Sequence, residues 1–156
     1  FGLRACAFRF GNVVGPRQTH GVGFDFLRSL RQRPNRLRIL GDGQQSKHYI
    51  HVSDVVQAVL CAAGTATAPF SVFNVATEDA VTVDEIADLA VETLGLAATP
   101  AREYTGGRRG WRGDVPVVRL DSTRIRSFGW IPKWNSREAV RHSLQELKAD
   151  ERILLN

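Results

Sequence analysis

Residues 39–54 read ILGDGQQSKHYIHVSD, and this stretch decides how the rest of the chain is interpreted. Gly41 and Gly43 bracket an aspartate, and they permit either a tight turn or a close approach of the backbone to a flat ligand such as a base. A polar run follows, and the short apolar segment after it predicts a strand over 48–52. The turn therefore delivers a lysine, a tyrosine and two histidines to the start of a strand.

Strand and helix patterns alternate on both sides of this stretch, which indicates an α/β fold. Apolar runs and alternation predict strands over 3–10, 36–40, 48–52, 70–76 and 117–121, the first of them buried. Helical spacing and capping signals predict helices over 24–33, 53–64, 83–94, 122–129 and 136–147. On the second helix we expect an inward face formed by Val55, Val56, Val59, Leu60 and Ala63.

The bulk composition is that of a globular protein: 156 residues, 43% hydrophobic and 24% charged. No apolar run approaches the ~20 residues of a membrane span, and no signal peptide opens the chain. Cys6 and Cys61 lie far apart in apolar segments, so we expect free thiols in a reducing cytoplasm. The chain has no methionine and begins inside an apolar element, so we expect it to be a fragment of a longer protein.

The net charge of +5 suits an anionic partner. The arginines between 28 and 38 are most simply a solvated helix face. Nucleic acid is the alternative, but stacking aromatics do not interleave with these arginines.

Three polar clusters follow predicted strands, where α/β folds place ligand sites. In the first, RFGNVVGPRQ, the Asn12 amide can both donate and accept, which suits a ligand with phosphates and hydroxyls. The alternative is that Asn12 only satisfies loop backbone. In the second, Lys47 is a candidate phosphate partner, or else a solvated lysine.

The histidines of the second cluster raise the question of a metal. We expect His48 and His51 to share one face of their strand. A third ligand at a recognisable spacing is missing from the sequence, so ordinary packing or ribose contact is the better interpretation, and we predict no metal site.

The third cluster is GGRRGWRGD, residues 106–114. A guanidinium there can grip a phosphate through two hydrogen bonds, and Asp114 can accept from sugar hydroxyls. The alternative is an exposed loop with an internal Arg–Asp pair, which would contribute little.

Several catalytic signatures are absent from the sequence. It contains no Gly-x-Gly-x-x-Gly after a strand, no phosphate-binding P-loop and no nucleophile elbow. Tyr-x-x-x-Lys is absent as well. We therefore assign no catalytic residue and no cofactor-binding residue to this chain.

The order of the pieces resembles the C-terminal half of the extended short-chain dehydrogenase/reductases, the NAD-dependent sugar-nucleotide epimerases and dehydratases, with UDP-glucose 4-epimerase-like members nearest. The resemblance runs nearly end to end. Its pieces are LRACAFRFGNVVGPRQ (3–18), LRILGDGQQSKHYIHVSDVVQAVLCA (37–62), FNVATEDAVTVDEIADLAVETLG (73–95) and GDVPVVRLDSTRIRSFGWIPKWNSREAVRHSL (113–144).

The resemblance implies a fold, and it implies which parts of the enzyme lie inside this chain and which lie outside it. Residues 1–156 would be a C-terminal fragment, mainly the smaller α/β sugar-nucleotide-binding domain, with the last strands and helices of a Rossmann-type parallel sheet interleaved. The N-terminal Rossmann core, with the NAD turn and the Ser/Tyr/Lys trio, would lie outside it. The intact parent would be an NAD-dependent epimerase or dehydratase, and the fragment alone would be inactive.

The resemblance also implies residue roles. Asn12 would contact the diphosphate, Lys47 would replace the usual phosphate-binding arginine, and Tyr49 would lie by the ribose. The base would be lined by the backbone of Ile39, Leu40 and Gly41.

In the third cluster, Trp111 occupies the place of the usual arginine before Asp114. Arg109 or Arg112 would then contact the phosphates, and we favour Arg109.

The implied partners are a UDP- or dTDP-sugar substrate, NAD held mainly by the N-terminal half, and a second copy of the full-length protein in a cytoplasmic homodimer. The alternatives are a non-catalytic nucleotide-sugar-binding protein and a basic nucleic-acid-binding module.

Overall fold

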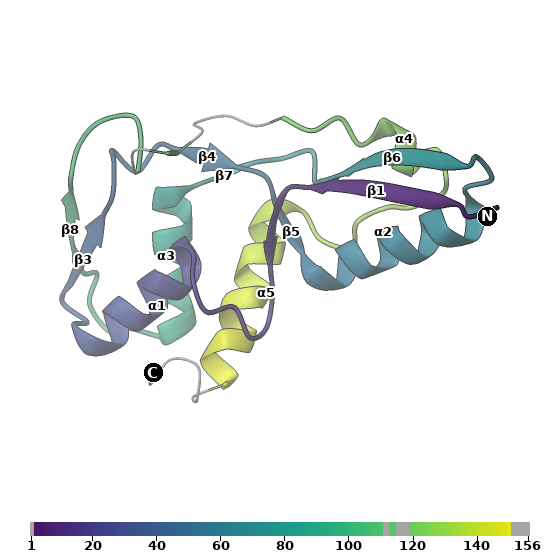
Figure 1. The fold of residues 1–156 in the computed structure, drawn as a ribbon. Helices are drawn as coiled ribbons and strands as arrows, with labels where there is room; N and C mark the ends of the chain where they lie inside the picture. The colour runs from purple at the N-terminus through teal and green to yellow at the C-terminus, as the bar shows by residue number, and fades with distance from the viewer. Residues whose placement is uncertain (1, 111–112, 115–118, 151–156) are drawn as a thin grey trace.

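A computed structural model describes residues 2–110, 113–114 and 119–150. It shows two groups of helices and strands that meet at β5, as Figure 1 illustrates. In chain order the elements are β1 (Ala5–Phe10), β2 (Asn12–Val14), α1 (Val22–Gln32), β3 (Arg36–Ile39), β4 (Ser46–Lys47), β5 (Tyr49–His51), α2 (Val52–Thr65), β6 (Phe70–Val75), β7 (Val81–Thr82), α3 (Val83–Leu94), β8 (Ala101–Tyr104), α4 (Thr123–Arg126) and α5 (Ser136–Ala149).

The first group is built on the parallel pair β1 and β6, with α2 and α4 beside it (Figure 1). Its apolar core joins both strands to α2 and to the segment that follows α4. Its buried members include Phe73 of β6, Ala58 of α2 and Trp130 after α4, and β1 contributes the partly buried Cys6 and Phe8. The Trp130 indole N–H donates to the carbonyl oxygen of Asp54 at 3.0 Å, which satisfies the ring nitrogen inside the core.

The second group packs α1, α3 and α5 side by side (Figure 1). The parallel pair β3–β8 lies along its outer edge, and the antiparallel pair β4–β7 leads into α3. Its core takes Leu27 and Leu30 from α1, Leu89 from α3 and Leu144 from α5, all almost fully buried.

The parallel pair β2–β5 joins the two groups. All three residues of β5 are buried, and the strand runs directly into α2. The Tyr49 amide N–H donates to the Ser136 hydroxyl oxygen at 3.0 Å, and that hydroxyl donates to the Asp79 carbonyl oxygen at 2.7 Å. This contact fixes the start of α5 against β5.

The helices predicted over 83–94 and 136–147 are confirmed, and their ends have local causes. The capping box at Thr82 and Glu85 forms in both directions, and α3 ends at Gly95 in the left-handed conformation. Asn135 caps α5, again with a reciprocal bond from Glu138. The face of α5 that carries Ala139, Val140, Ser143, Leu144 and Leu147 is buried.

The predicted inward face of α2 is confirmed at Val55 and wrong at Val56, Leu60 and Ala63. The helix buries Asp54, Val55, Ala58 and Ala62, whereas Val56 and Leu60 are exposed by 49% and 59%. Most sides of this helix are apolar, so periodicity alone does not choose the buried face. The small alanines are the residues that let the helix approach the sheet.

The first strand is shorter and less buried than predicted. It begins at Ala5, and its residues are half-buried or exposed because β1 pairs only with β6 within the described residues. Phe10 and Phe70 are exposed by 41% and 60%. The α/β class itself is confirmed.

Other differences concern short elements. The strands β2, β4, β7 and β8 were not predicted, because they are brief or polar and depend on pairing with distant segments. The helix predicted over 122–129 is the single turn α4. The predicted strand over 117–121 lies partly outside the described residues, and 119–121 are irregular. Over the ranges that the structure describes, no helix is both long and apolar enough to cross a membrane.

Replacing Ser136 tests the joint between β5 and α5. Ser136→Ala leaves the buried Tyr49 amide N–H without its acceptor, so we expect the free energy of unfolding to fall by about 1–3 kcal/mol. Urea unfolding followed by circular dichroism measures the change. Ser127→Ala removes an exposed hydroxyl that donates to the Arg124 carbonyl oxygen, and it should change stability by less than about 0.5 kcal/mol. Equal changes in the free energy of unfolding for Ser136→Ala and Ser127→Ala would contradict the role assigned to the Ser136 hydroxyl.

Candidate functional site

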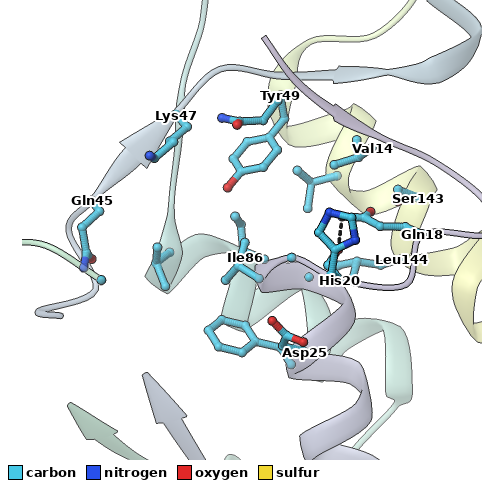
Figure 2. A pocket seen from close by; sticks show the side chains of 18 of the residues that line it. Val14, Gln18, His20, Asp25, Gln45, Lys47, Tyr49, Ile86, Ser143 and Leu144 are labelled. Atoms are coloured by element: carbon cyan, nitrogen blue, oxygen red, sulfur yellow. Dashed lines mark hydrogen bonds between the residues drawn. The ribbon is translucent and has the colours of Figure 1, made fainter. Parts of the chain in front are cut away.

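A cavity of about 720 Å³ lies between the second group of helices and the strands β4 and β5. Residues from β2, α1, β3, β4, β5, α3 and α5 line it, together with the loops around Gln18, Gln45 and Gly110. Figure 2 shows Lys47 and Tyr49 entering from one side, with Asp25 and His20 across from them. Its floor is apolar, formed by residues such as Ile86 and Leu144.

An ion pair in the cavity joins Lys47 to Asp114. The Lys47 ammonium donates to the Asp114 carboxylate, and both side chains are largely buried, with 24% and 7% exposed. Burial acts to raise the pKa of Asp114. The hydrogen bonds from Lys47 and the Gly110 amide, with the charges of Lys47 and Arg109, outweigh that effect and hold the pKa below its ordinary value. Asp114 is therefore an anion, and an acceptor, at neutral pH.

Tyr49 presents a neutral hydroxyl to the same cavity. Burial, and secondarily the negative charge of Asp114, raise the pKa of Tyr49 to about 12. The hydroxyl therefore keeps its proton at neutral pH and can donate a hydrogen bond. A tyrosine in this state does not act as a general base near neutral pH, which agrees with the absence of a Tyr-x-x-x-Lys motif around it.

Gln45 adds an acceptor that sequence reasoning missed. Its side-chain amide N–H donates to the Leu40 carbonyl oxygen at 3.0 Å, which fixes which end is nitrogen. Its carbonyl oxygen Oε1 is buried and has no hydrogen-bond partner among the described residues. A buried acceptor without a donor is costly, so this atom fits a ligand that carries an N–H or O–H group.

The structure brings five of the eight predicted site residues to this one cavity: Asn12, Leu40, Lys47, Tyr49 and Asp114. The Asn12 side-chain amide N–H also donates to the His48 carbonyl oxygen at 3.4 Å, a long hydrogen bond. Part of its hydrogen-bonding capacity is therefore used by the backbone.

The other three predicted residues are not among those that line the cavity. Ile39 is fully buried in the apolar core. Gly41 forms a tight turn with φ of +83°, its amide bonded to the Thr105 hydroxyl at 2.8 Å. Arg109 is exposed and acts on the site through its charge near Asp114. The alternative phosphate ligand Arg112, and Trp111, lie outside the described residues.

Three charged or titratable residues at the cavity were also missed: Arg38, His20 and Asp25. Arg38 had a usable signal, because alternation along β3 places it on the same face as Leu40, whereas Leu37 and Ile39 point into the core. His20 and Asp25 had no such signal, since the loop before α1 positions them.

The two histidines near β5 do not share a face, contrary to the sequence prediction. The His48 ring nitrogen Nδ1 donates to the Thr77 carbonyl oxygen at 3.1 Å. His51 is buried and bonds Ser53 and Glu146 instead. A spacing of three residues places side chains on opposite faces of a strand, which is the physical reason for the error.

A family model, a curated relative and solved structures all relate this chain to enzymes that act on nucleotide sugars. Residues 1–76 match the NAD dependent epimerase/dehydratase family. A dTDP-6-deoxy-L-talose 4-dehydrogenase (NAD(P)(+)) of Kitasatospora kifunensis is 32% identical, covering 89% of this chain and 45% of that protein.

Two crystal structures are also similar. A UDP-galactose 4-epimerase has 38% identity and a TM-score of 0.81, with 97% of this chain and 48% of that chain covered. The UDP-glucose 4-epimerase of Thermotoga maritima, solved with UDP-glucose, has 31% identity and a TM-score of 0.76, over 95% and 47%.

These comparisons confirm the resemblance and the predicted fold, a Rossmann-like α/β arrangement with parallel strands. The chain spans about half the length of the curated relatives it matches.

The titration of Tyr49 is a direct test of the cavity. Its pKa in the folded protein lies above the ordinary tyrosine value of about 10, so its contribution to stability is complete below pH 10 and is lost as the pH rises toward 12. We expect absorbance at about 295 nm to show an ionisation near pH 12 that disappears in Tyr49→Phe.

Tyr104 is the matched control, since it is the other tyrosine of the chain. Its hydrogen bond to Asp84 raises its pKa, but it is nearly half exposed. Tyr104→Phe should leave the transition near pH 12 in place. Loss of that transition in Tyr104→Phe rather than in Tyr49→Phe would reverse the assignment.

Proposed function

The chain belongs to the NAD-dependent epimerase/dehydratase family, and on that premise we propose that it forms the sugar-nucleotide-binding part of an epimerase or dehydratase most like UDP-glucose 4-epimerase. The observation that carries the proposal is the convergence of Asn12, Lys47, Tyr49 and Asp114 on one cavity. These residues come from three separate segments of the sequence, and each supplies a different kind of polar group.

The groups match the chemistry of a nucleoside diphosphate sugar. Lys47 contributes the positive charge for the phosphates, and the Asn12 amide adds a donor beside it. The neutral Tyr49 hydroxyl is suited to a ribose oxygen, and the Asp114 carboxylate accepts from sugar hydroxyls. Near the carbonyl of Leu40, Gln45 Oε1 is suited to an N–H of the base.

The Lys47–Asp114 contact shapes how such a ligand binds. A diphosphate must compete with the Asp114 carboxylate for the Lys47 ammonium. When phosphate takes the ammonium, Asp114 becomes available to a sugar hydroxyl. Lys47 then binds the pyrophosphate and Asp114 binds the sugar. Holding the sugar in place contributes to catalysis by positioning.

The chain does not by itself carry the features of an NAD site, because its sequence has no glycine-rich dinucleotide turn after a strand. When bound, NAD supplies the acceptor for a hydride from the sugar. We propose that sequence N-terminal to this chain holds the cofactor and the catalytic residues, and that the chain alone is inactive.

The sheet β1–β6 supports this division. Parallel sheets are normally covered on both faces, yet Phe10 and Phe70 are substantially exposed here. We propose that these strands continue a larger parallel sheet contributed by the N-terminal half. The homodimer and the cytoplasmic location stay predictions.

Replacing Lys47 tests the proposal in the intact enzyme. Lys47→Ala removes the phosphate partner and leaves Asp114 uncompensated, so we expect affinity for a UDP- or dTDP-sugar to fall by about ten- to hundredfold, as for the loss of a charged hydrogen bond. NAD affinity should change little. Isothermal titration calorimetry with each ligand measures both quantities.

The matched control is Lys148→Ala, which removes an exposed lysine that donates to the Thr93 carbonyl oxygen and is not among the cavity-lining residues. It should leave both affinities unchanged. Unaltered sugar-nucleotide binding in Lys47→Ala would remove this residue from the site. Oligonucleotide binding that outcompetes UDP and falls steeply with salt would favour the nucleic-acid alternative instead.

A further inference from the structure

A second cluster of polar side chains lies where α5 crosses the start of α2. It consists of His51, His142 and Glu146, and it is separate from the residues that line the cavity. His51 is the last residue of β5, and the other two occupy positions four apart on α5, so they lie on one face of that helix. One side-chain ligand atom from each residue lies within 4.8 Å of the others.

Hydrogen bonds to both ring nitrogens orient the His51 side chain. Its Nδ1 accepts from the Ser53 amide N–H at 3.3 Å, because His51 is the N-cap of α2. The proton of a neutral ring is then on Nε2, and Nε2 donates to Glu146 Oε2 at 2.9 Å. The atom that faces the cluster is therefore a nitrogen whose ring is already oriented by a bond to its other nitrogen. A metal-binding histidine donates from its other ring nitrogen, and the Ser53 hydroxyl oxygen, 2.9 Å from Nδ1, is placed to accept that bond.

The other two groups are placed to complete a set of ligands. His142 Nε2 lies 3.7 Å from Glu146 Oε1, and the His51 and His142 ring centroids are 5.2 Å apart. Trp134 packs against both rings at 4.8 and 4.6 Å and covers one side of the cluster. His51 is almost fully buried, whereas His142 and Glu146 are partly exposed, so the latter two are free to adjust.

We propose that His51, His142 and Glu146 form a binding site for a divalent transition-metal ion, with Zn²⁺ the best match. Two imidazole nitrogens and one carboxylate oxygen are the donor set that Zn²⁺ accepts, with water at the fourth position. At metal–ligand distances of about 2 Å the donor atoms must approach to about 3.5 Å of one another. Rotation of the two α5 side chains supplies that movement. The His51 ring proton moves from Nε2 to Nδ1, which then donates to the Ser53 hydroxyl oxygen, and the Nε2 lone pair binds the metal.

The site joins the two groups of the fold. His51 begins α2, which packs on the β1–β6 sheet, and α5 belongs to the second group. A bound ion would add a bond between them beside the Tyr49–Ser136 contact. The neighbouring face of α5 carries Ser143 and Leu144 to the cavity wall, so the ion would also stiffen that wall.

The test uses the full-length protein, stripped with a chelator and titrated with ZnCl₂ alone. We expect one Zn²⁺ per chain by calorimetry, and an increase in melting temperature with added Zn²⁺, since a ligand of the native state stabilises it. With Co²⁺ as the probe, we expect visible absorption bands of a nitrogen- and oxygen-coordinated ion.

Two variants remove single ligands, and both positions are partly exposed, so folding is checked by circular dichroism. His142→Ala and Glu146→Gln should each weaken Zn²⁺ binding by at least about tenfold and should abolish the Co²⁺ bands. His20→Ala is the matched control, because it removes an exposed imidazole outside the cluster and should leave Zn²⁺ affinity unchanged.

Two outcomes would overturn the proposal. One is that Zn²⁺ does not raise the melting temperature of the wild-type protein. The other is binding that His142→Ala leaves intact, or that His20→Ala weakens as much. The result is independent of sugar-nucleotide binding, because none of its measurements uses a nucleotide.

Discussion

The complete burial of β5 is the constraint on which the rest of the structure depends. Three residues carry the connection between two apolar cores, so each backbone group there must find a partner away from water. Pairing with β2 supplies partners for the backbone groups along one edge of β5. The Ser136 hydroxyl oxygen accepts a hydrogen bond from the Tyr49 amide N–H. This arrangement brings the start of α5 to β5, and with it the apolar wall of the cavity. A slip of one residue would turn Tyr49 away from that cavity.

Charge compensation is the second organising feature. Lys47 and Asp114 are largely buried, and a buried charge requires a partner of opposite sign. Their contact keeps Asp114 ionised, and its negative charge in turn favours the protonated form of Tyr49. The cavity thus presents a cation, an anion and a neutral donor within one set of coupled groups. Gln45 Oε1 adds an acceptor that has no partner in the part of the chain that the structure describes. A ligand that carries phosphates, hydroxyls and an N–H complements all of these groups.

The α5 helix serves two regions at once. Its buried residues Val140, Ser143 and Leu144 line the cavity, and His142 and Glu146 face the start of α2. A helix spaces residues three and four apart along one face, so a short sequence can supply both surfaces without conflict. The position of α5 therefore bears on nucleotide binding and on the proposed metal site, although the two sites use different residues.

The sequence by itself determined the elements whose causes are local. Capping residues at Thr82 and Asn135 and the spacing of apolar residues set α3 and α5, and the order of motifs indicated the family and five of the cavity residues. Tertiary structure decided the rest. It selected Ala58 and Ala62 rather than Val56 and Leu60 as the buried face of α2, because apolar residues occur on more than one side of this helix. It also brought His51 next to His142 and Glu146. The His51–Glu146 hydrogen bond joins two residues that are 95 positions apart in the chain. Only packing creates such proximity, so no local pattern could have revealed it.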